Sequence, residues 1–446
     1  MPTIPPDMLT VGAREVQQLF DRAAANHVAP GFQYVVFDED NLLINSVAGF
    51  SSLPNESDPS SSSPGKPLTR ENAYWIASAG RIAISVLALI ILERGLAKNG
   101  MTIDDLDNHE KLVEILPEFT LGGESWMVKV IEGFEEGRPK LRPTITPVTL
   151  RGIMTHTIGL ALPWTSELYR QLCAPSDGSE PLRPSLMSGL IDSFIYPAIC
   201  EPGQCVTYGI AAEWLGQFVV RATGTNLRKL LAKYIFEPLE MSKEECDTAI
   251  TANIQKVLAP THVKTADART PLKEIPFVGL SLEGDPEPGY AHIAGALIYT
   301  STQTFCKLLQ AILRRDECLM KAGTWGLATT DALAGTSIKV PVPRDSGISR
   351  LEYYNKPIDI GQSSSVNLLQ CDVALGPGLS GRPKGSFGWT GLLNVYFHID
   401  PTNGIGYMFS TACGPFGHPE FIALRDEFEK LIYQMLEKSD VRVHRA

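Results

Sequence analysis

The feature that most constrains the fold is a segment that is apolar on nearly every side, residues 82–92, interrupted only by Ser85. A helix without a polar face must be surrounded by protein on all sides. The segment is about half as long as the roughly 20 residues that cross a bilayer, and Gly95 follows it as a helix stop. The sequence therefore predicts a buried central helix that begins close to Ser78.

Strands are predicted at both ends of the chain. The expected strands are 31–37, 42–49, 387–399 and 404–411. The second pair is joined by DPTNG at 400–404, a typical turn sequence. A helix with apolar residues at helical spacing is expected over 14–27, and a final helix over about 419–437.

The middle of the chain is predicted to be mostly helical from 104 to 236, with proline-rich loops such as 139–147. Further helices are expected over 215–223, 227–235 and 302–314. Two polar segments are expected to be irregular. Residues 51–66 are a serine-rich, exposed insertion, and 258–291 are a long loop that could border an active site.

This order of elements predicts an α+β fold in which one antiparallel sheet is assembled from both chain ends and flanked by helices. A helical region is inserted between the two halves of the sheet. We expect residues 1–446 to form a single domain, with an α/β part at about 1–96 and 290–446 and a helical part at about 97–289.

Composition narrows the function classes. The 446 residues have a net charge of −11 and are 44% hydrophobic, as in globular proteins. Nucleic-acid binding requires clustered Lys and Arg side chains that neutralise phosphates. The sequence contains no such cluster, so no nucleic-acid partner is expected. The N-terminus lacks the basic start and apolar core of a signal peptide, and no segment is a membrane span. The eight cysteines are too sparse for a disulfide framework, so we expect reduced thiols and a cytoplasmic location.

Ser78 and Arg81 are the first residues with chemical potential. Helix N-termini present free N–H groups and a positive field, which favour a developing oxyanion near Ser78. Arg81 lies on the same face of the predicted helix, three residues further along. Taken alone, the pair is better explained by a helix-capping serine and an arginine in a structural ion pair.

Three further segments change that balance, because they follow Ser78 in a fixed order. They are LRGIMTHTIGL at 150–160, EPGQCVTYG at 201–209 and FGWTG at 387–391. Together they resemble the serine β-lactamase and penicillin-binding-protein superfamily, whose motifs are S-x-x-K, Leu-Thr-His-Thr-x-Gly-Leu, Y-x-N and a Lys/His-x-Gly strand. Within it, the chain is similar to the fungal polyketide acyltransferases of the lovastatin side-chain type, also through ERGL at 93–96 and RATG at 221–224. The resemblance implies a β-lactamase/transpeptidase-like fold.

The resemblance also implies roles for individual residues. Ser78 matches the acyl-accepting nucleophile, and Tyr208 matches the tyrosine that takes or relays its proton. Residues 388–391 match the strand beside the site, so that the backbone N–H of Leu392 would join that of Ser78 in an oxyanion hole. His156 matches a residue that is structural in the family, and we expect it to be a packed core histidine.

Three positions depart from the family pattern. The lysine of S-x-x-K is Arg81, which stays charged and therefore cannot be a general base. It could still stabilise the phenolate form of Tyr208. The asparagine of Y-x-N is replaced by Ile210, and Trp389 replaces the Lys or His of the edge strand. Trp389 suggests an aromatic wall for an apolar ligand, with Thr390, Gly391 and Leu392 beside it. The same sequence pattern would also fit a tryptophan that faces outward from an edge strand.

Three functions are compatible with these residues. The first is a serine-dependent acyltransferase or esterase that acts on a bulky, apolar, polyketide-type metabolite through an acyl-Ser78 intermediate. Its donor would be a small molecule or an acyl thioester on a carrier. The second is a non-covalent cyclase, isomerase or lyase that uses Arg81 and Tyr208 in the same pocket. The third is a binding protein with a decayed site. No cofactor and no metal are expected, because the histidines and cysteines show no ligand spacing.

Overall fold

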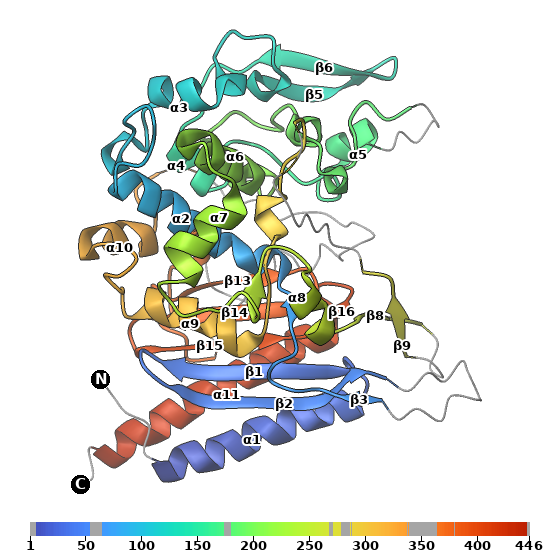
Figure 1. The fold of residues 1–446 in the computed structure, drawn as a ribbon, viewed down its shortest axis with the longest axis vertical. Helices are drawn as coiled ribbons and strands as arrows, with labels where there is room; N and C mark the ends of the chain where they lie inside the picture. Colours follow the sequence, from blue (N-terminus) through green and yellow to red (C-terminus); the bar gives the residue numbers. More distant parts are fainter. Residues whose placement is uncertain are drawn as a thin grey trace.

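The core of the computed structural model is an eight-stranded sheet with the order β11-β12-β13-β14-β15-β1-β2-β3 (Figure 1). Every neighbouring pair in it is antiparallel. The strands are β1 (Gly31–Asp38), β2 (Leu42–Ser52), β3 (Lys66–Pro67), β11 (Ser364–Val366), β12 (Asp372–Ala374), β13 (Phe387–Gly391), β14 (Val395–Asp400) and β15 (Ile405–Ser410). Because β1 pairs with β15, both chain ends build one sheet, as predicted.

The structure describes residues 6–53, 65–173, 180–266, 271–277, 286, 288–336, 338, 364–378 and 380–443. Most of the predicted serine-rich insertion at 51–66 and parts of the predicted loop at 258–291 lie outside these residues.

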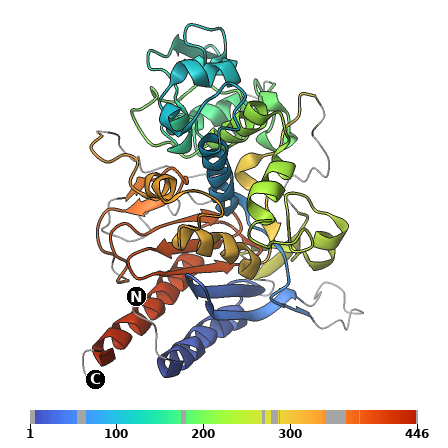
Figure 2. The same cartoon turned by 60° about the vertical axis from the view of Figure 1, so that its left-hand side comes forward.

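Helices cover both faces of the sheet. Side chains alternate along each strand, so apolar residues of one strand such as β1 reach both faces and need cover on each. Phe32 and Tyr34 of β1 pack in one apolar cluster with α1 (Pro6–Ala25) and α11 (Pro419–Val443). Val35 and Phe37 point to the other face, into the cluster that includes α9 (Thr302–Leu313) and the central helix. Helices α1 and α11 lie side by side under the sheet in both views (Figures 1 and 2).

A buried ion pair connects α11 to Arg382, next to the sheet, and a hydrogen bond connects it to Tyr407 of β15. The carboxylate of Glu429 accepts hydrogen bonds from Arg382 Nε at 2.6 Å, Ser380 Oγ at 3.0 Å and Tyr407 Oη at 3.0 Å. The side chains of Arg382 and Glu429 are only 4% and 2% exposed. Such a pair is stable because further hydrogen bonds satisfy the carboxylate.

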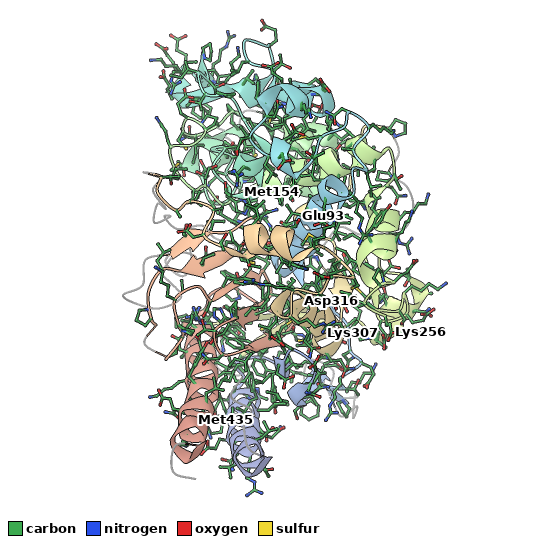
Figure 3. The ribbon with its side chains drawn as sticks, turned by 90° about the vertical axis from the view of Figure 1, so that its left-hand side faces the viewer. Glu93, Met154, Lys256, Lys307, Asp316 and Met435 are labelled. Atoms are coloured by element: carbon green, nitrogen blue, oxygen red, sulfur yellow. The ribbon has the colours of Figure 1, made fainter. Side chains whose placement is uncertain are left out.

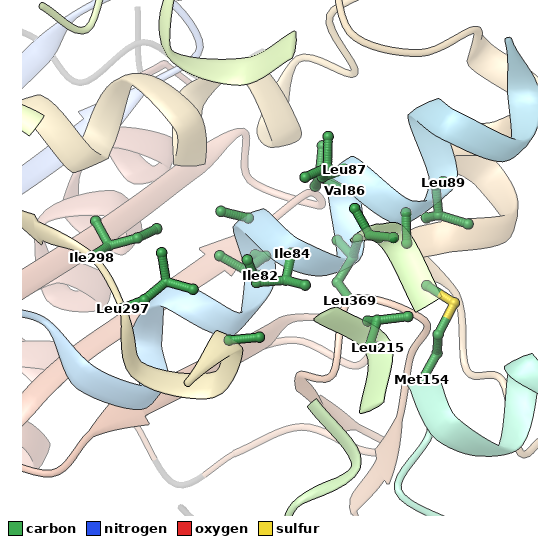
Figure 4. Close-up of a cluster of buried hydrophobic side chains, with 14 of the residues drawn as sticks. Ile82, Ile84, Val86, Leu87, Leu89, Met154, Leu215, Leu297, Ile298 and Leu369 are labelled. Carbon is green, nitrogen blue, oxygen red and sulfur yellow. The ribbon is translucent and has the colours of Figure 1, made fainter. Parts of the chain in front are cut away.

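The predicted central helix is α2 (Arg81–Glu93), and every residue from Arg81 to Leu92 is buried. Figure 4 shows Ile82, Ile84 and Leu87 among side chains from other elements, including Met154 and Leu215. These two come from α4 (Leu150–Met154) and α6 (Ala211–Thr223). The helix therefore joins the sheet to the helical part of the chain. Glu93, at its end, accepts the backbone N–H of Lys321 at 3.0 Å, where α10 (Ala322–Thr329) begins (Figure 3).

The inserted region is less helical than predicted. Its helices are α3 (His109–Ile115), α4, α5 (Glu167–Cys173), α6, α7 (Leu227–Leu231) and α8 (Ala252–Val257). It also contains a hairpin of β5 (Lys129–Glu135) and β6 (Arg138–Pro143), where a proline-rich loop was expected. Proline is tolerated here because Pro139 and Pro143 both lie in β6, the edge strand of this small sheet. Smaller sheets join β4 (Tyr74–Trp75), β10 (Tyr299–Thr300) and β7 (Cys246–Asp247), and β16 (Cys413–Gly414), β8 (Thr261–Lys264) and β9 (Leu272–Ile275).

One predicted strand is in fact two. The segment 387–399 forms β13 and β14, which pair antiparallel across a turn at 392–394. Asn394 makes this turn with a φ of 58°, and its side chain donates hydrogen bonds to the carbonyls of Cys413 and Pro415. Apolar residues run through the turn, so the sequence pattern hides it. The α+β class, with one antiparallel sheet flanked by helices, is confirmed, whereas the boundaries near 96 and 290 remain predictions. In the described part of the chain, no helix combines the length and the apolar character needed to cross a membrane.

We expect Glu429→Gln to lower the free energy of unfolding by about 3 kcal/mol, because it leaves the Arg382 guanidinium buried without a counter-charge. The matched control is Glu427→Gln on the same helix. Glu427 meets Arg22 at 3.4 Å with both side chains more than half exposed, and such pairs contribute about 0–1 kcal/mol. Guanidinium-chloride unfolding of both variants measures the difference. Equal midpoints for the two variants would show that the buried pair does not hold α11.

Candidate active site

Ser78 lies in a 3-10 turn, Ala77–Gly80, that leads directly into α2. Ala77, Ala79 and Gly80 are buried, and Ser78 is the only half-buried residue of the turn. Ala77 has a φ of 47°, in the left-handed region that residues with a Cβ rarely adopt. Backbone strain of this kind persists only where the surroundings enforce it, and it is concentrated at functional sites. The predicted nucleophile therefore follows a strained residue at the start of the central helix.

The end of β13 lies against this turn. A Cβ atom added at Gly391 would be 2.2 Å from the carbonyl oxygen of Ile76, so only glycine allows this approach. Trp389, Thr390 and Leu392 are half-buried beside it. The structure thus brings the predicted strand residues 389–392 to the turn of Ser78, which is the arrangement that an oxyanion hole from Ser78 and Leu392 would need.

The loop that carries Tyr208 is held by the THTIGL segment. Backbone N–H groups of Gly203, Thr207 and Ile199 donate to the carbonyls of Thr157, His156 and Gly159 at 2.7, 2.7 and 2.9 Å. A Cβ added at Gly209 would be 1.9 Å from the carbonyl oxygen of Leu160, so the two segments are in close contact at Tyr208 as well. The motif at 150–160 therefore supports the loop of Tyr208 through hydrogen bonds to its backbone carbonyls.

Tyr208, His156 and Trp389 form an aromatic cluster from three separate segments. The ring centroids of Tyr208 and Trp389 are 5.0 Å apart, and those of His156 and Tyr208 are 5.4 Å apart. His156 is buried, as expected, and neither ring nitrogen has a hydrogen-bond partner among the described residues. Burial lowers the pKa of His156 well below its usual value, and the charge of Arg81 lowers it further. His156 is thus a neutral wall of the site.

Arg81 lies beneath this cluster and does not reach the surface, with 3% exposure. Its guanidinium carbon lies 4.2 Å from the centroid of the Tyr208 ring, a cation–π contact. Nη1 donates to the carbonyl of Gly209 at 3.2 Å, and Nε lies 3.4 Å from the carbonyl oxygen of Gly295. Gly295 belongs to the 3-10 turn Ala294–Ala296. Arg81 is therefore engaged with protein groups around Tyr208.

Two residues of the site were missed from the sequence, Glu213 and Gly295. Glu213 is 2% exposed in α6, and its carboxylate and the Arg81 guanidinium both lie close to the Cα of Gly295. Burial raises the pKa of Glu213, and the charge of Arg81 opposes that rise. A signal was present in the sequence: Glu213 is the one charged residue in the apolar stretch 210–220, five residues after Tyr208. In the part of the chain that the structure describes, no group of three or more His, Cys, Asp or Glu could hold a metal ion.

Comparison with known proteins agrees with this geometry. A family model described as Beta-lactamase matches residues 16–427. The chain belongs to the beta-lactamase family. Within this family, it is 27% identical over 386 residues to a monacolin J acid methylbutanoyltransferase of Aspergillus terreus, covering 83% of this chain and 84% of that protein. It is 23% identical over 261 residues to a lovastatin esterase of Penicillium rubens, covering 57% and 59%.

Among solved structures, a mutant of simvastatin synthase from Aspergillus terreus matches with a TM-score of 0.74 and 23% identity, covering 96% of this chain and 98% of that one. This likeness shows the shared beta-lactamase-family fold. The resemblance to fungal acyltransferases of the lovastatin type is confirmed by the relatives, and the chain is an enzyme of the acyltransferase and esterase class. The roles of Ser78, Tyr208, Arg81 and residues 389–392 remain predictions.

We expect Gly391→Ala to slow hydrolysis of an activated ester such as p-nitrophenyl butanoate by about 100-fold, because a displacement of about 1 Å at a reacting centre has that effect. The new Cβ would push β13 away from the carbonyl of Ile76. The control is Gly326→Ala in α10, where an added Cβ meets no atom within 4 Å. If Gly391→Ala were as active as Gly326→Ala, the contact between β13 and the turn of Ser78 would have no catalytic role.

Proposed function

We propose that the chain is a serine-dependent acyltransferase that moves an acyl group to a hydroxyl of a bulky, apolar, polyketide-type metabolite through an acyl-Ser78 intermediate. Water in place of the alcohol makes the same site an esterase. The observation that carries the proposal is the placement of Arg81, which is buried under Tyr208 and bound to protein carbonyls. The roles below are derived from that placement.

The first half-reaction transfers the acyl group to the protein. Ser78 Oγ attacks the carbonyl of a thioester or ester while its proton passes to Tyr208, whose phenolate form Arg81 stabilises. The backbone N–H groups of Ser78 and Leu392 would stabilise the oxyanion. The leaving thiolate or alkoxide takes the proton back from Tyr208, and acyl-Ser78 remains.

The second half-reaction reverses the roles. The hydroxyl of the acceptor gives its proton to Tyr208 and attacks the acyl-Ser78 carbonyl. The ester product forms as the Ser78–acyl bond breaks, and the Ser78 oxygen recovers the proton. The protein ends in its starting state, so the cycle needs no cofactor or metal.

The buried guanidinium weighs against the non-covalent alternative. A cyclase or isomerase built on Arg81 would need its N–H groups to polarise a substrate carbonyl. With 3% exposure and contacts to Gly209, Gly295 and the Tyr208 ring, Arg81 acts on the protein and not on a substrate. The same engagement weighs against a decayed site, because a buried charge is costly to retain.

The substrate class is inferred from the relatives and from Trp389. The names of the relatives specify a methylbutanoyl transfer to monacolin J acid and an esterase of lovastatin. Trp389, half-buried beside Tyr208, would supply a flat apolar surface for an acceptor of this kind. We propose a small-molecule thioester or a carrier-bound thioester as the donor. We propose the cytoplasm as the compartment, on the spacing of the eight cysteines.

We expect a fluorophosphonate to add one phosphonyl group to the chain, at Ser78, as measured by intact mass and peptide mapping. Ser78→Ala should abolish the adduct and nearly all transfer from a butanoyl thioester. Ser85→Ala is the control on the same helix, since Ser85 is buried and accepts a hydrogen bond from Gln370 Nε2 at 3.0 Å. Retention of most activity in Ser78→Ala, or labelling at another residue, would contradict the acyl-enzyme mechanism.

We expect Tyr208→Phe to reduce turnover by at least 100-fold, because it removes the proton acceptor and keeps the ring over Arg81. Arg81→Lys should retain activity or raise it, since lysine can itself accept a proton and restores the residue of the family motif. Steady-state kinetics with one donor and one acceptor measure both effects. Loss of activity in Arg81→Lys together with an active Tyr208→Phe would instead favour a guanidinium that grips the substrate.

A further inference from the structure

Glu213 is an ionisable residue in the protein interior near Arg81, and it has no role in the mechanism above. Glu213 is one of the few carboxylates in the described part of the chain with 2% exposure or less. Its Oε2 is buried and makes no hydrogen bond to a described residue. A carboxylate in such a place is unstable unless a positive charge or hydrogen-bond donors compensate it.

Gly295 connects the two charged groups through its backbone. Its carbonyl oxygen accepts a hydrogen bond from Arg81 Nε at 3.4 Å, and its backbone lowers the pKa of Glu213 against the effect of burial. A Cβ placed on Gly295 would be 2.7 Å from Glu213 Oε1 and 3.1 Å from Arg81 Nη2. The two charged groups are therefore within about 6 Å of each other, close enough to affect each other's charge state.

The guanidinium has a different neighbour on each side. Toward the site it faces the Tyr208 ring at 4.2 Å, and toward α6 it faces Gly295 and Glu213. Its in-plane donors are directed to the carbonyls of Gly209 and Gly295. Movement of Glu213 or loss of its charge would therefore act on Tyr208 through Arg81.

We propose that Glu213 is a positioning residue that serves as the counter-ion of Arg81 and thereby sets how strongly Arg81 stabilises the ionised form of Tyr208. The proposal rests on the proposed function, because it assigns Glu213 to the same proton transfer. With Glu213 ionised, part of the positive field of Arg81 is cancelled at Tyr208. Without that charge, the field of Arg81 on Tyr208 is stronger, and transfer of the Ser78 proton to Tyr208 is favoured.

The elements packed around the pair contribute three further titratable side chains, His156, Cys200 and Cys205. His156, from the THTIGL segment, is neutral because burial and Arg81 both lower its pKa. Residues 387–391 of β13 and the turn Ala294–Ala296 contribute no titratable side chain. Cys200 and Cys205 share the loop of Tyr208, and their sulfurs contact the Thr207 hydroxyl at 3.9 and 3.3 Å. The hydrogen bond between the two thiols lowers the pKa of Cys205 to about 6 and raises that of Cys200, so Cys205 is the other group on this loop that can carry a charge near neutral pH. Glu213 is the carboxylate whose charge couples to Arg81.

The test is the pH dependence of the rate at which a fluorophosphonate labels Ser78, measured by intact mass for the full chain and its variants. Glu213→Gln keeps the size of the side chain but removes the charge. We expect the rising limb of its profile to move to lower pH by about one unit. Glu213→Asp restores the charge and should return the midpoint to that of the unmodified chain.

The matched control is Glu118→Gln. Glu118 accepts a hydrogen bond from Arg221 of α6 at 2.9 Å, so this variant removes a carboxylate from an arginine pair on the same helix without facing Arg81. Its profile should stay unchanged. A labelling profile of Glu213→Gln that falls in height but keeps its midpoint would overturn the proposal and leave Glu213 a structural residue. Absence of any Ser78 adduct in the unmodified chain is a different result, since it contradicts the proposed function itself.

Discussion

The buried guanidinium of Arg81 is the interaction on which the rest of the site depends. Moving a charged group of this size from water into a protein costs several kcal/mol even after relaxation. The chain offsets that cost with the carbonyls of Gly209 and Gly295, the face of the Tyr208 ring and the carboxylate of Glu213. These partners come from the loop of Tyr208, from the turn before β10 and from α6. One arginine on the central helix thus contacts the loop of Tyr208 with the adjoining α6, and the turn Ala294–Ala296, which is far from them in the sequence.

This requirement explains several local features together. Gly209 and Gly295 must be glycines, because a Cβ at either would meet a neighbouring backbone or the charged groups themselves. The THTIGL segment uses its carbonyls to hold the loop of Tyr208. Ser78 is presented one turn before Arg81, beside a strained Ala77 and the end of β13. The proposed nucleophile precedes the central helix directly, and the proposed proton acceptor contacts Arg81 of the same helix, which is the rigid support that an accurate catalytic geometry needs.

Sequence reasoning predicted the parts of this arrangement that leave a local pattern. The apolar run 82–92 predicted the buried helix. The strand patterns at both chain ends predicted one sheet built from both termini, and the ordered motifs predicted the family. It could not predict the β5–β6 hairpin, since prolines at 139 and 143 indicate a loop in any local scheme. The split of 387–399 into two strands depends on the side-chain bonds of Asn394 to residues 413 and 415, which no sequence window contains. Glu213 is marked in the sequence as the one charged residue of an apolar stretch, but its proximity to Arg81, 132 positions away on α2, is visible only in the fold.

The central claim is that Ser78 carries the acyl group although the lysine of the family motif is an arginine. The most direct measurement is rapid quenching of the chain with a butanoyl thioester of N-acetylcysteamine in the absence of an acceptor, followed by intact mass and peptide mapping. The account predicts a butanoyl group on Ser78 that disappears when an alcohol acceptor is added, with formation of its ester. Ester formation without any acylated peptide under conditions of single turnover, or with the acyl group on another residue, would contradict it.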